Sequence, residues 1–150
     1  MLTKKGKYGL KALVHLAQLP VGESSVVSDI AARNNIPKKF LDAILLELRN
    51  NGILKSKKGA GGGYSLAKPA SEIRIGEAIR ALDGPLAPIL CASRTAYQPC
   101  DDCADPETCQ VRLSMTTVRD AISDILDNMS LAQFTAAEAA RSIPSISVLG

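Results

Sequence analysis

The fold is decided by residues 28–67, SDIAARNNIPKKFLDAILLELRNNGILKSKKGAGGGYSLA. This stretch predicts a short helix over residues 29–34 with Ser28 as its N-cap, a tight turn at Asn35, and a longer helix over residues 38–51 that Gly52 stops. Two helices joined by about four residues, the second beginning with cations, are typical of a helix-turn-helix, whose second helix can enter a major groove. An ordinary helical hairpin would show the same pattern.

The second helix has one apolar face and a charged amino end. Pro37 suits its first helical position. The residues expected to be buried recur at helical spacing: Phe40, Leu41, Ile44, Leu45 and Leu48. Lys38, Lys39 and Asp42 lie near the amino end, where a recognition helix contacts base edges, so we expect them to carry part of the base recognition.

Two short strand patterns follow this helix. They cover residues 53–56 and 64–67, and a basic, glycine-rich turn over residues 57–63 joins them. The hairpin is typical of the wing of a winged helix-turn-helix, and Lys57 and Lys58 are expected to contact DNA phosphates. A nucleotide-binding phosphate loop is disfavoured, because the glycine run precedes a strand instead of opening a helix and lacks the Gly-Lys-Ser/Thr ending.

Two further amphipathic helices complete the expected DNA-binding domain, residues 1–84. Apolar residues recur at the spacing of one buried helical face in each: Leu10, Leu13, Val14 and Ala17 in the first, and Ile75, Ala78, Ile79 and Leu82 in the last. Gly84 closes the last helix. His15, the only histidine, is expected to be a solvated residue of the first helix. The predicted fold class is mainly α with a small β-hairpin wing.

Charge is distributed unevenly along the chain. Residues 1–90 carry fourteen Lys and Arg against seven Asp and Glu, a net charge of +7, whereas residues 91–150 carry four against eight, a net charge of −4. A polyanionic partner is therefore expected for the first part only. Aromatic residues make up 3% of the chain and Trp is absent, so duplex DNA is favoured over single strands that stack on aromatic rings.

All four cysteines fall within nineteen residues: Cys91, Cys100, Cys103 and Cys109. Most of this stretch belongs to an expected loop over residues 85–105. The basic amino terminus lacks a secretion signal, so we expect a cytoplasmic protein with no membrane partner, in which clustered thiols serve metal or redox chemistry. Their spacing alone fits an iron–sulfur cluster, a closed zinc site or a disulfide switch equally well. A small redox carrier would leave the basic hairpin unexplained.

A long helix and a short following segment are expected over residues 106–134, with Asp105 as N-cap and Pro106 in the first position. Its apolar residues alternate steps of four and three, the period of a coiled-coil seam: Val111, Met115, Val118, Ile122, Ile125 and Met129. From Pro106 to Met129 the helix would be about 36 Å long. This length favours a homodimer about a twofold axis, with packing back on its own domain as the alternative. The tail over residues 135–150 is expected to be partly disordered.

The chain resembles the winged helix-turn-helix regulators of the IscR, NsrR and RirA type. The resemblance extends from the first residue to about Phe134 and is carried by four stretches: KKGKYGL at 4–10, IPKKFL at 36–41, LRNNG at 48–52 and GGGYSLA at 61–67. It implies a transcriptional regulator, expected to be a repressor, that binds a pseudo-palindromic DNA operator and is not an enzyme. The residues expected to bind DNA are Lys4, Lys5, Pro37, Lys38, Lys39, Asp42, Arg49, Lys57, Lys58, Gly61, Gly62 and Tyr64.

The resemblance also implies a cofactor. In this family three cysteines between the wing domain and the dimer helix commonly hold an iron–sulfur cluster that senses iron, redox or nitric oxide status. Cys91, Cys103 and Cys109 match these positions, and a 2Fe-2S cluster is expected ahead of a 4Fe-4S cluster, with zinc as the alternative. Cys100 departs from the family pattern. The fourth ligand is therefore Cys100 itself, a residue from the first helix of the partner chain, or a small molecule.

Overall fold

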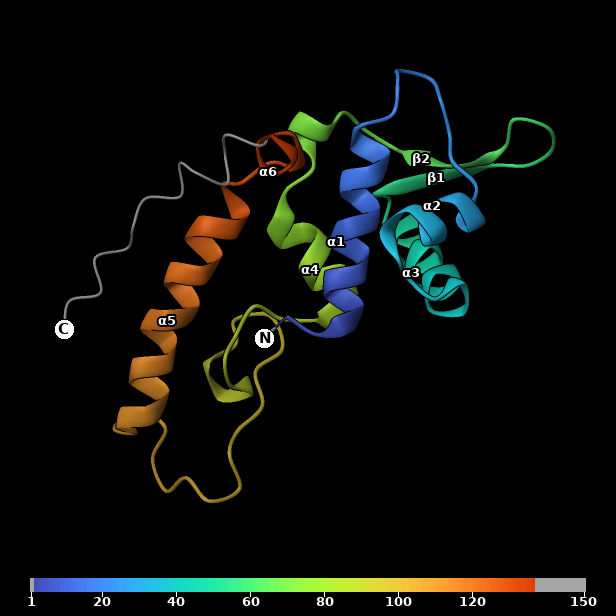
Figure 1. Ribbon diagram of the computed structural model, residues 1–150. Coiled ribbons are helices and arrows are strands. Elements are labelled where there is room, and N and C mark those ends of the chain that lie inside the picture. Colours follow the sequence, from blue (N-terminus) through green and yellow to red (C-terminus); the bar gives the residue numbers. More distant parts are fainter. Residues whose placement is uncertain (1, 137–150) are drawn as a thin grey trace.

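Three helices and a hairpin build the amino-terminal part of the molecule, as the computed structural model shows (Figure 1). The structure describes residues 2–136. The elements of this part are α1 (Lys4–Ala17), α2 (Val27–Asn34), α3 (Lys38–Asn50), β1 (Leu54–Lys57) and β2 (Gly63–Leu66). α1 contacts α2 and α3, and also α4 (Ile75–Asp83) and α6 (Leu131–Thr135) from the other part of the chain. α1 is therefore the central helix of the domain.

The start of α1 is fastened to the end of α4. The Thr3 side chain caps α1 by accepting a hydrogen bond from the backbone N–H of Gly6, at 3.2 Å. The Thr3 hydroxyl and backbone N–H both donate to the Asp83 carboxylate, at 2.5 and 2.9 Å. Gly9 lets the two helices approach closely, because a Cβ there would collide with the side chain of Leu82. The start of α1 is thus held by Asp83, the last residue of α4.

The core confirms the predicted fold class. Buried residues come from α1, α2, α3, α4, the start of β1 and α6, and the largest fully buried side chains are Leu13, Ile30, Leu41, Leu45, Leu48, Ile53, Ile73, Ile75 and Leu131. The expected inward residues of α4 are all buried. In α1, Leu10 and Leu13 are buried, whereas Val14 and Ala17 are only partly buried against the core. Phe40 is a correction, since its side chain is 62% exposed instead of buried.

The turn between α2 and α3 has the expected tight geometry. Asn35 adopts the left-handed conformation with φ 53°, which Asn tolerates better than most residues, and buried Ile36 follows it. The start of α2 differs from the prediction, because its N-cap is Val26 and Ser28 lies inside the helix. Pro37 is the N-cap of α3, one position earlier than expected.

The hairpin pairs β1 and β2 antiparallel, with Leu54 opposite Leu66 and Lys57 opposite Gly63. Both strands are displaced by one residue from the predicted positions. An isolated bridge joins Tyr64 to Ser25, a residue just ahead of α2, through backbone hydrogen bonds of 2.8 and 2.9 Å. The base of the wing is therefore fastened to the segment that leads into the helix-turn-helix.

The carboxyl-terminal part contains η1 (Ala70–Glu72), α4, η2 (Leu90–Ala92), α5 (Gln110–Asp127) and α6. α5 begins later than predicted: Asp105 caps only a turn, in which its carboxylate accepts from the Glu107 N–H at 3.0 Å, and Cys109 is the N-cap. With eighteen residues, α5 is about 27 Å long, shorter than the predicted 36 Å. Of the predicted tail, residues 137–150 lie outside the described residues. Among the described helices, none is long and apolar enough to cross a bilayer.

Candidate nucleic-acid interface and cysteine site

The face of α3 opposite the core is fully accessible. Lys38, Lys39, Asp42 and Ala43 are exposed, as expected for a recognition helix. Lys38 is not a free cation, because its ammonium lies 3.1 Å from the Asp42 carboxylate one turn further along. Pro37 is exposed at the start of this face. The expected base-reading residues are thus brought together at the amino end of α3.

The wing presents its cations on an extended hairpin. Lys57, Lys58 and Gly61 are exposed near the tip, whereas Gly62 and, at the base, Tyr64 are half-buried. Position 63, next to Tyr64, requires glycine for two reasons. Its φ is 134°, and a Cβ there would collide with the backbone carbonyl of Ser25. The glycine run therefore allows a tight hairpin that packs on the segment before α2.

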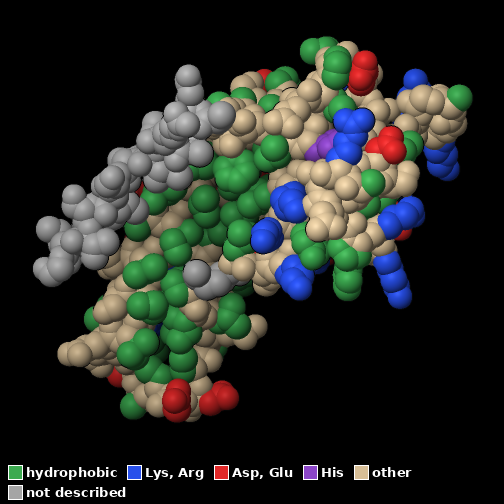
Figure 2. Space-filling view, viewed as in Figure 1, with side chains coloured by type: hydrophobic (Ala, Val, Ile, Leu, Met, Phe, Trp, Pro, Cys, Tyr) green, Lys and Arg blue, Asp and Glu red, His purple; other side chains and the backbone are tan. Residues whose placement is uncertain are grey.

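Arg49 and the lysines at the start of α1 extend the basic surface. Arg49 is exposed in the last turn of α3 and donates to the Ser56 hydroxyl at 3.3 Å, which connects α3 to β1. Lys5 forms a 2.5 Å ion pair with Glu47 of α3. Figure 2 shows Lys and Arg side chains gathered over the winged-helix part of the molecule. The expected DNA-binding cations therefore lie on the part of the chain with the positive net charge.

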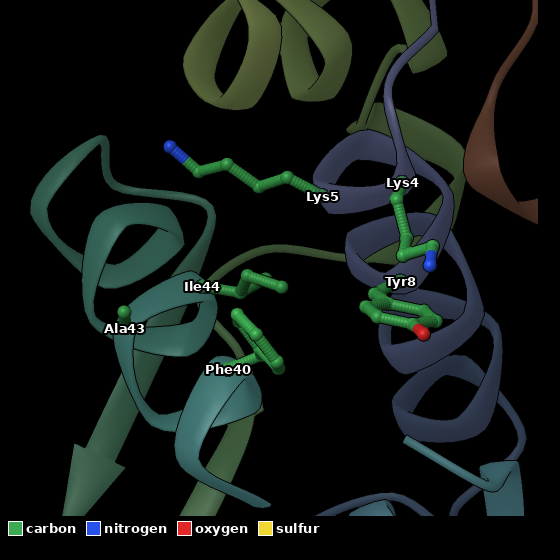
Figure 3. A pocket seen from close by; sticks show the side chains of 6 residues that line it. All are labelled: Lys4, Lys5, Tyr8, Phe40, Ala43 and Ile44. Atoms are coloured by element: carbon green, nitrogen blue, oxygen red, sulfur yellow. The ribbon is translucent and has the colours of Figure 1, made fainter. Parts of the chain in front are cut away.

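An apolar groove lies between α1 and α3. It has a volume of about 310 Å³ and is lined by Lys4, Lys5, Tyr8, Phe40, Ala43 and Ile44. Figure 3 shows Phe40 and Ile44 pointing from α3 toward Tyr8 on α1. Phe40 therefore borders the groove, and most of its side chain stays exposed. The sequence pattern missed it, because helical spacing alone does not show how far the neighbouring helix reaches.

His15 is a second correction, since it is part-buried in a polar network and is not a solvated residue. Its Nδ1 lies 3.1 Å from the Asn34 side-chain amide, and its Nε2 lies 3.2 Å from the Ser25 hydroxyl. Asn34 also donates to the Ile30 carbonyl at 2.8 Å. Burial, followed by the nearby charge of Arg33, lowers the pKa of His15 below its ordinary value. His15 therefore links α1, the end of α2 and the segment that anchors the wing.

The four cysteines are free thiols arranged as two pairs. Cys91 is buried in η2, and the other three are half-buried. Hydrogen bonding with the Cys91 thiol is the main reason that the pKa of Cys100 is raised to about 11. Burial, followed by the charge of Cys109, raises the pKa of Cys103. Hydrogen bonding from the backbone N–H of Arg112 in the first turn of α5 lowers the pKa of Cys109, as expected for an anion at a helix amino end.

Two arginines of α5 hold the cysteine loop. Arg112 donates through Nε to the Cys91 carbonyl at 2.9 Å and through Nη1 to the Pro106 carbonyl at 3.3 Å. Arg119 donates to the Ala92 carbonyl at 2.5 Å and also pairs with Asp120. The contacts with Cys91 and Ala92 join residues more than twenty positions apart, so the sequence offered no signal for them. The position of the loop and the position of α5 are therefore mechanically coupled.

The other end of α5 is coupled to the DNA-binding domain. Arg80 of α4 forms a two-pronged ion pair with Asp127, with nitrogen–oxygen distances of 2.6 and 2.8 Å. Hydrogen bonding from Arg80 lowers the pKa of Asp127. Separate polar contacts thus join the cysteine loop to α5, α5 to α4, and Asp83 at the end of α4 to the start of α1.

The apolar stripe of α5 is not buried against any other described part of the chain. None of its eighteen residues is buried. Val111, Val118 and Ile125 are exposed, while Met115 and Ile122 are partly exposed. Met129 differs from the rest of the predicted stripe, because it follows the end of α5 and packs against the core. Figure 2 shows hydrophobic side chains along the region of α5.

Comparison with known proteins gives relatives over almost the whole chain. Residues 2–137 match the model of the Rrf2 family, described as an iron-dependent transcriptional regulator. A Rhodobacter capsulatus protein, named as an rrf2-like HTH-type transcriptional regulator, is 43% identical over 140 residues, which are 91% of this chain and 93% of that protein. The HTH-type transcriptional regulator IscR of Pectobacterium carotovorum is 32% identical over 130 residues, which are 87% of this chain and 76% of that protein.

A solved structure shares the architecture as well. The structure of CymR, titled the global cysteine regulator of B. subtilis, matches with a TM-score of 0.72 and 30% sequence identity. The match covers 90% of this chain and 95% of that chain. The match therefore extends well beyond residues 1–84.

Proposed function

Because the chain belongs to the Rrf2 family of transcriptional regulators, we propose that its binding to DNA is controlled by an iron–sulfur cluster held in the cysteine loop. Relatives across the family are DNA-binding regulators of transcription, not enzymes. The observation that carries the proposal is the clustering of four free thiols in one loop. Arg112 and Arg119 of α5 donate hydrogen bonds to the Cys91 and Ala92 carbonyls and so hold this loop against α5. A change at the thiols is thereby transmitted to the helix that is proposed to join the two subunits.

The donor set suits a cluster in its chemistry. Thiolates are the ligands that iron–sulfur clusters require, and a 2Fe-2S cluster takes four of them, two on each iron. The described residues contain no group of three His, Cys, Asp or Glu side chains that already converge on one metal position. Among the cysteines, Cys91 has the largest influence on the pKa of Cys100, and Cys109 has the largest influence on the pKa of Cys103, a two-by-two grouping that suits a 2Fe-2S cluster.

We assign Cys91, Cys103 and Cys109 as ligands by the resemblance, and Cys100 as the fourth by its pairing with Cys91. A bound cluster would supply a group whose loss or oxidation reports iron or redox status. The chain's own residues prepare the site: the first turn of α5 directs backbone N–H groups at Cys109, and Arg112 holds the Cys91 carbonyl in place. Each contact stabilises the loop in a form from which thiolates can bind metal.

DNA binding is proposed to require a homodimer in the cytoplasm. The exposed apolar stripe of α5 would pair with its copy about a twofold axis, and each α3 would enter a major groove. The two half-sites should then lie about 34 Å, or one helical turn, apart on a pseudo-palindromic operator. Family membership and the exposed α3 face support this arrangement.

A thiol–disulfide switch is the second candidate, and the paired thiols favour it specifically. Oxidation of each pair by glutathione disulfide would remove two protons and two electrons, form one S–S bond and release two molecules of glutathione. The expected bonds are Cys91–Cys100 and Cys103–Cys109, because Cys91 is the main cause of the raised pKa of Cys100 and Cys109 contributes to the raised pKa of Cys103. A closed zinc site of four thiolates is the remaining use of the same donors.

One experiment separates the three uses. The protein is purified without oxygen, and its visible absorption, iron, acid-labile sulfide and zinc are measured, first for the wild type and then for Cys→Ser variants at each cysteine. We expect iron and sulfide in equal amounts, with the absorption lost in variants of Cys91, Cys103 and Cys109 and altered in the Cys100 variant. Zinc without sulfide would establish the closed zinc site instead. Metal-free protein that forms the two disulfides with glutathione disulfide would establish the switch.

A further inference from the structure

The exposed face of α3 carries a row of apolar side chains. Phe40, Ala43 and Leu46 follow one another at intervals of three residues, which places them along one diagonal ridge of the helix. Phe40 is 62% exposed and Leu46 is 43% exposed. The core-facing residues of the same helix, Leu41 and Leu45 among them, are fully buried, so the ridge is not part of the hydrophobic core.

The ridge is surrounded by cations. Lys4 and Lys5 line the groove beside Phe40 (Figure 3). Lys38 and Lys39 precede Phe40 in the first turn of α3. Lys5 and Lys38 already pair with Glu47 and Asp42, but a partner that offered apolar contact alone would leave the ammonium groups of Lys4 and Lys39 without counterions. Duplex DNA satisfies both features, because its phosphates attract the lysines while its major groove presents apolar groups at particular base pairs.

The apolar group that the major groove presents is the 5-methyl group of thymine. We propose that Phe40, Ala43 and Leu46 form a thymine-reading surface, in which each side chain contacts the 5-methyl group of a thymine in the half-site. This inference rests on the proposed entry of α3 into the major groove. It assigns the operator a class of sequence: thymine at the positions under the ridge, recognised by apolar contact instead of by hydrogen bonds.

The nearby hydrogen-bonding side chains are not expected to recognise the thymine methyl groups. Lys38 is already paired with Asp42 at 3.1 Å, which engages both charges with each other. Lys39 remains exposed beside the ridge and is free to contact a phosphate or a guanine. The ridge therefore adds selectivity at positions that the charged residues do not read.

Replacement of thymidine by deoxyuridine tests the proposal, because it removes the methyl group and leaves every hydrogen-bonding group in place. The probe is the tightest-binding duplex selected by the full-length wild-type protein from random-sequence DNA, together with versions that carry deoxyuridine at one thymine at a time. We expect about a fourfold loss of affinity for each methyl group that the ridge contacts, with no loss at other thymines.

Variants connect the loss to particular side chains. Phe40→Ala and Leu46→Ala should each bind the thymine duplex more weakly, and at one position each should no longer distinguish thymine from uracil. Val21→Ala, a change at an exposed apolar residue in the turn after α1, should preserve the full discrimination. Circular dichroism and thermal unfolding of each variant identify any loss of fold, and the wild-type comparison of thymine with uracil requires no variant.

The outcomes distinguish this inference from the function on which it rests. Tight duplex binding that no deoxyuridine weakens, or discrimination that persists in both ridge variants, would overturn the thymine-reading surface and leave the regulator assignment intact. Failure to select any duplex, by protein with or without its metal, would overturn the proposed DNA control and this inference together.

Discussion

At the scale of single residues, His15 shows how one side chain connects three segments. The side-chain NH2 group of Asn34 donates to the Ile30 carbonyl and to His15 Nδ1, so Nδ1 is an acceptor. Nε2 therefore carries the ring proton and donates it in a hydrogen bond to the Ser25 hydroxyl. A proton on Nδ1 as well would face the Asn34 NH2 group, which is itself a donor, and this hydrogen bond would be lost. The neutral ring is therefore the form that suits the folded state, in agreement with its lowered pKa.

Stability should fall in mild acid because of His15. Its pKa in the folded protein lies below the ordinary 6.5, so below that pH the unfolded chain takes up the proton more readily than the folded one. The contribution of neutral His15 is fully present above pH 6.5 and is lost as the pH falls toward the folded pKa. Urea unfolding at about pH 7.5 and about pH 5.5 measures the drop. His15→Gln should show a smaller drop, and an unchanged drop would show that other groups cause it.

Gly63 is the residue on which the position of the wing depends. In Gly63→Ala the new Cβ would meet the Ser25 backbone and lie 2.9 Å from the Val26 nitrogen, at a φ that Ala rarely adopts. We expect the free energy of unfolding to fall by about 1–3 kcal/mol and DNA affinity to weaken for all sequences.

Gly61→Asn is the matched control for Gly63→Ala. Gly61 also has a positive φ, of 71°, but a Cβ there meets nothing within 4 Å, and Asn tolerates this region. Denaturant unfolding of both variants makes the comparison, and filter binding measures the DNA affinity of Gly63→Ala alone, because Gly61 is itself an expected DNA-binding residue. Equal losses in the free energy of unfolding of Gly63→Ala and Gly61→Asn would indicate that the backbone freedom of glycine matters and that the close approach to Ser25 does not.

At the scale of elements, α5 combines an unburied apolar stripe with polar tethers at both ends. Such a helix is poorly stabilised by its own chain, since most helical stability in proteins comes from packing of the apolar face. Its loop-side tethers are Arg112 and Arg119, and its α4-side tether is Asp127.

Charge in the stripe should separate the subunits. Val118 is exposed and Ile122 lies one turn further along the same stripe, so Asp at both positions would place two carboxylates in the proposed dimer contact. We expect monomers by light scattering and loss of duplex binding. A double variant that remains dimeric and binds DNA would refute the role of α5, and Thr117→Asp, an exposed position outside the stripe, serves as the control.

The α4-side tether should weaken when its space is filled. Gly76→Ala would place a Cβ against the Asp127 carboxylate and 3.2 Å from Arg80 Nη1, so the ion pair must move. We expect a loss of about 1 kcal/mol or less in the free energy of unfolding, because both side chains are partly exposed. Asp127→Asn should produce a similar loss, whereas Asp124→Asn should not. Gly76→Ala and Asp127→Asn together should lower the free energy of unfolding by no more than either change alone. Urea unfolding of the two single variants and the double variant checks this expectation.

At the scale of the whole molecule, charge and chemistry are divided between two parts. The net charge of +7 belongs to the residues that build the winged helix, and the net charge of −4 belongs to the thiol loop, α5 and the remaining residues. The positive part lies where a polyanion can reach it, on the face that includes α3 and the wing (Figure 2).

The salt dependence of DNA binding should report this division. Lys58→Ala removes a wing cation expected to contact a phosphate, so binding should weaken similarly for every sequence and the slope of log affinity against log salt should fall by about one unit. Fluorescence anisotropy at several salt concentrations measures the slope. Lys39→Ala on α3 is the comparison and should alter sequence preference. The assignment of wing and helix must be exchanged if Lys58→Ala changes preference without changing the slope.

Much of the fold was predictable because it depends on local patterns. The helices, the turn at Asn35 and the hairpin follow from apolar spacing and from residues that tolerate particular backbone angles, and both are visible within short windows of sequence. The start of α5 was misplaced, because Asp105 and Pro106 suit a turn as well as a helix start. The exposure of Phe40 was missed because it depends on where α1 lies.

By itself the sequence determined the winged-helix architecture, the separation of charge and the identity of the thiols, since these depend on residue type and on neighbours a few positions away. Only the tertiary structure decided which thiols pair, that His15 joins the wing anchor to α2, that Arg112, Arg119 and Arg80 couple the loop to the DNA-binding domain, and that α3 carries an apolar ridge. The physical reason is the same for each. These contacts join residues that are distant in the chain or depend on how closely two elements pack, and neither leaves a periodic trace in the sequence.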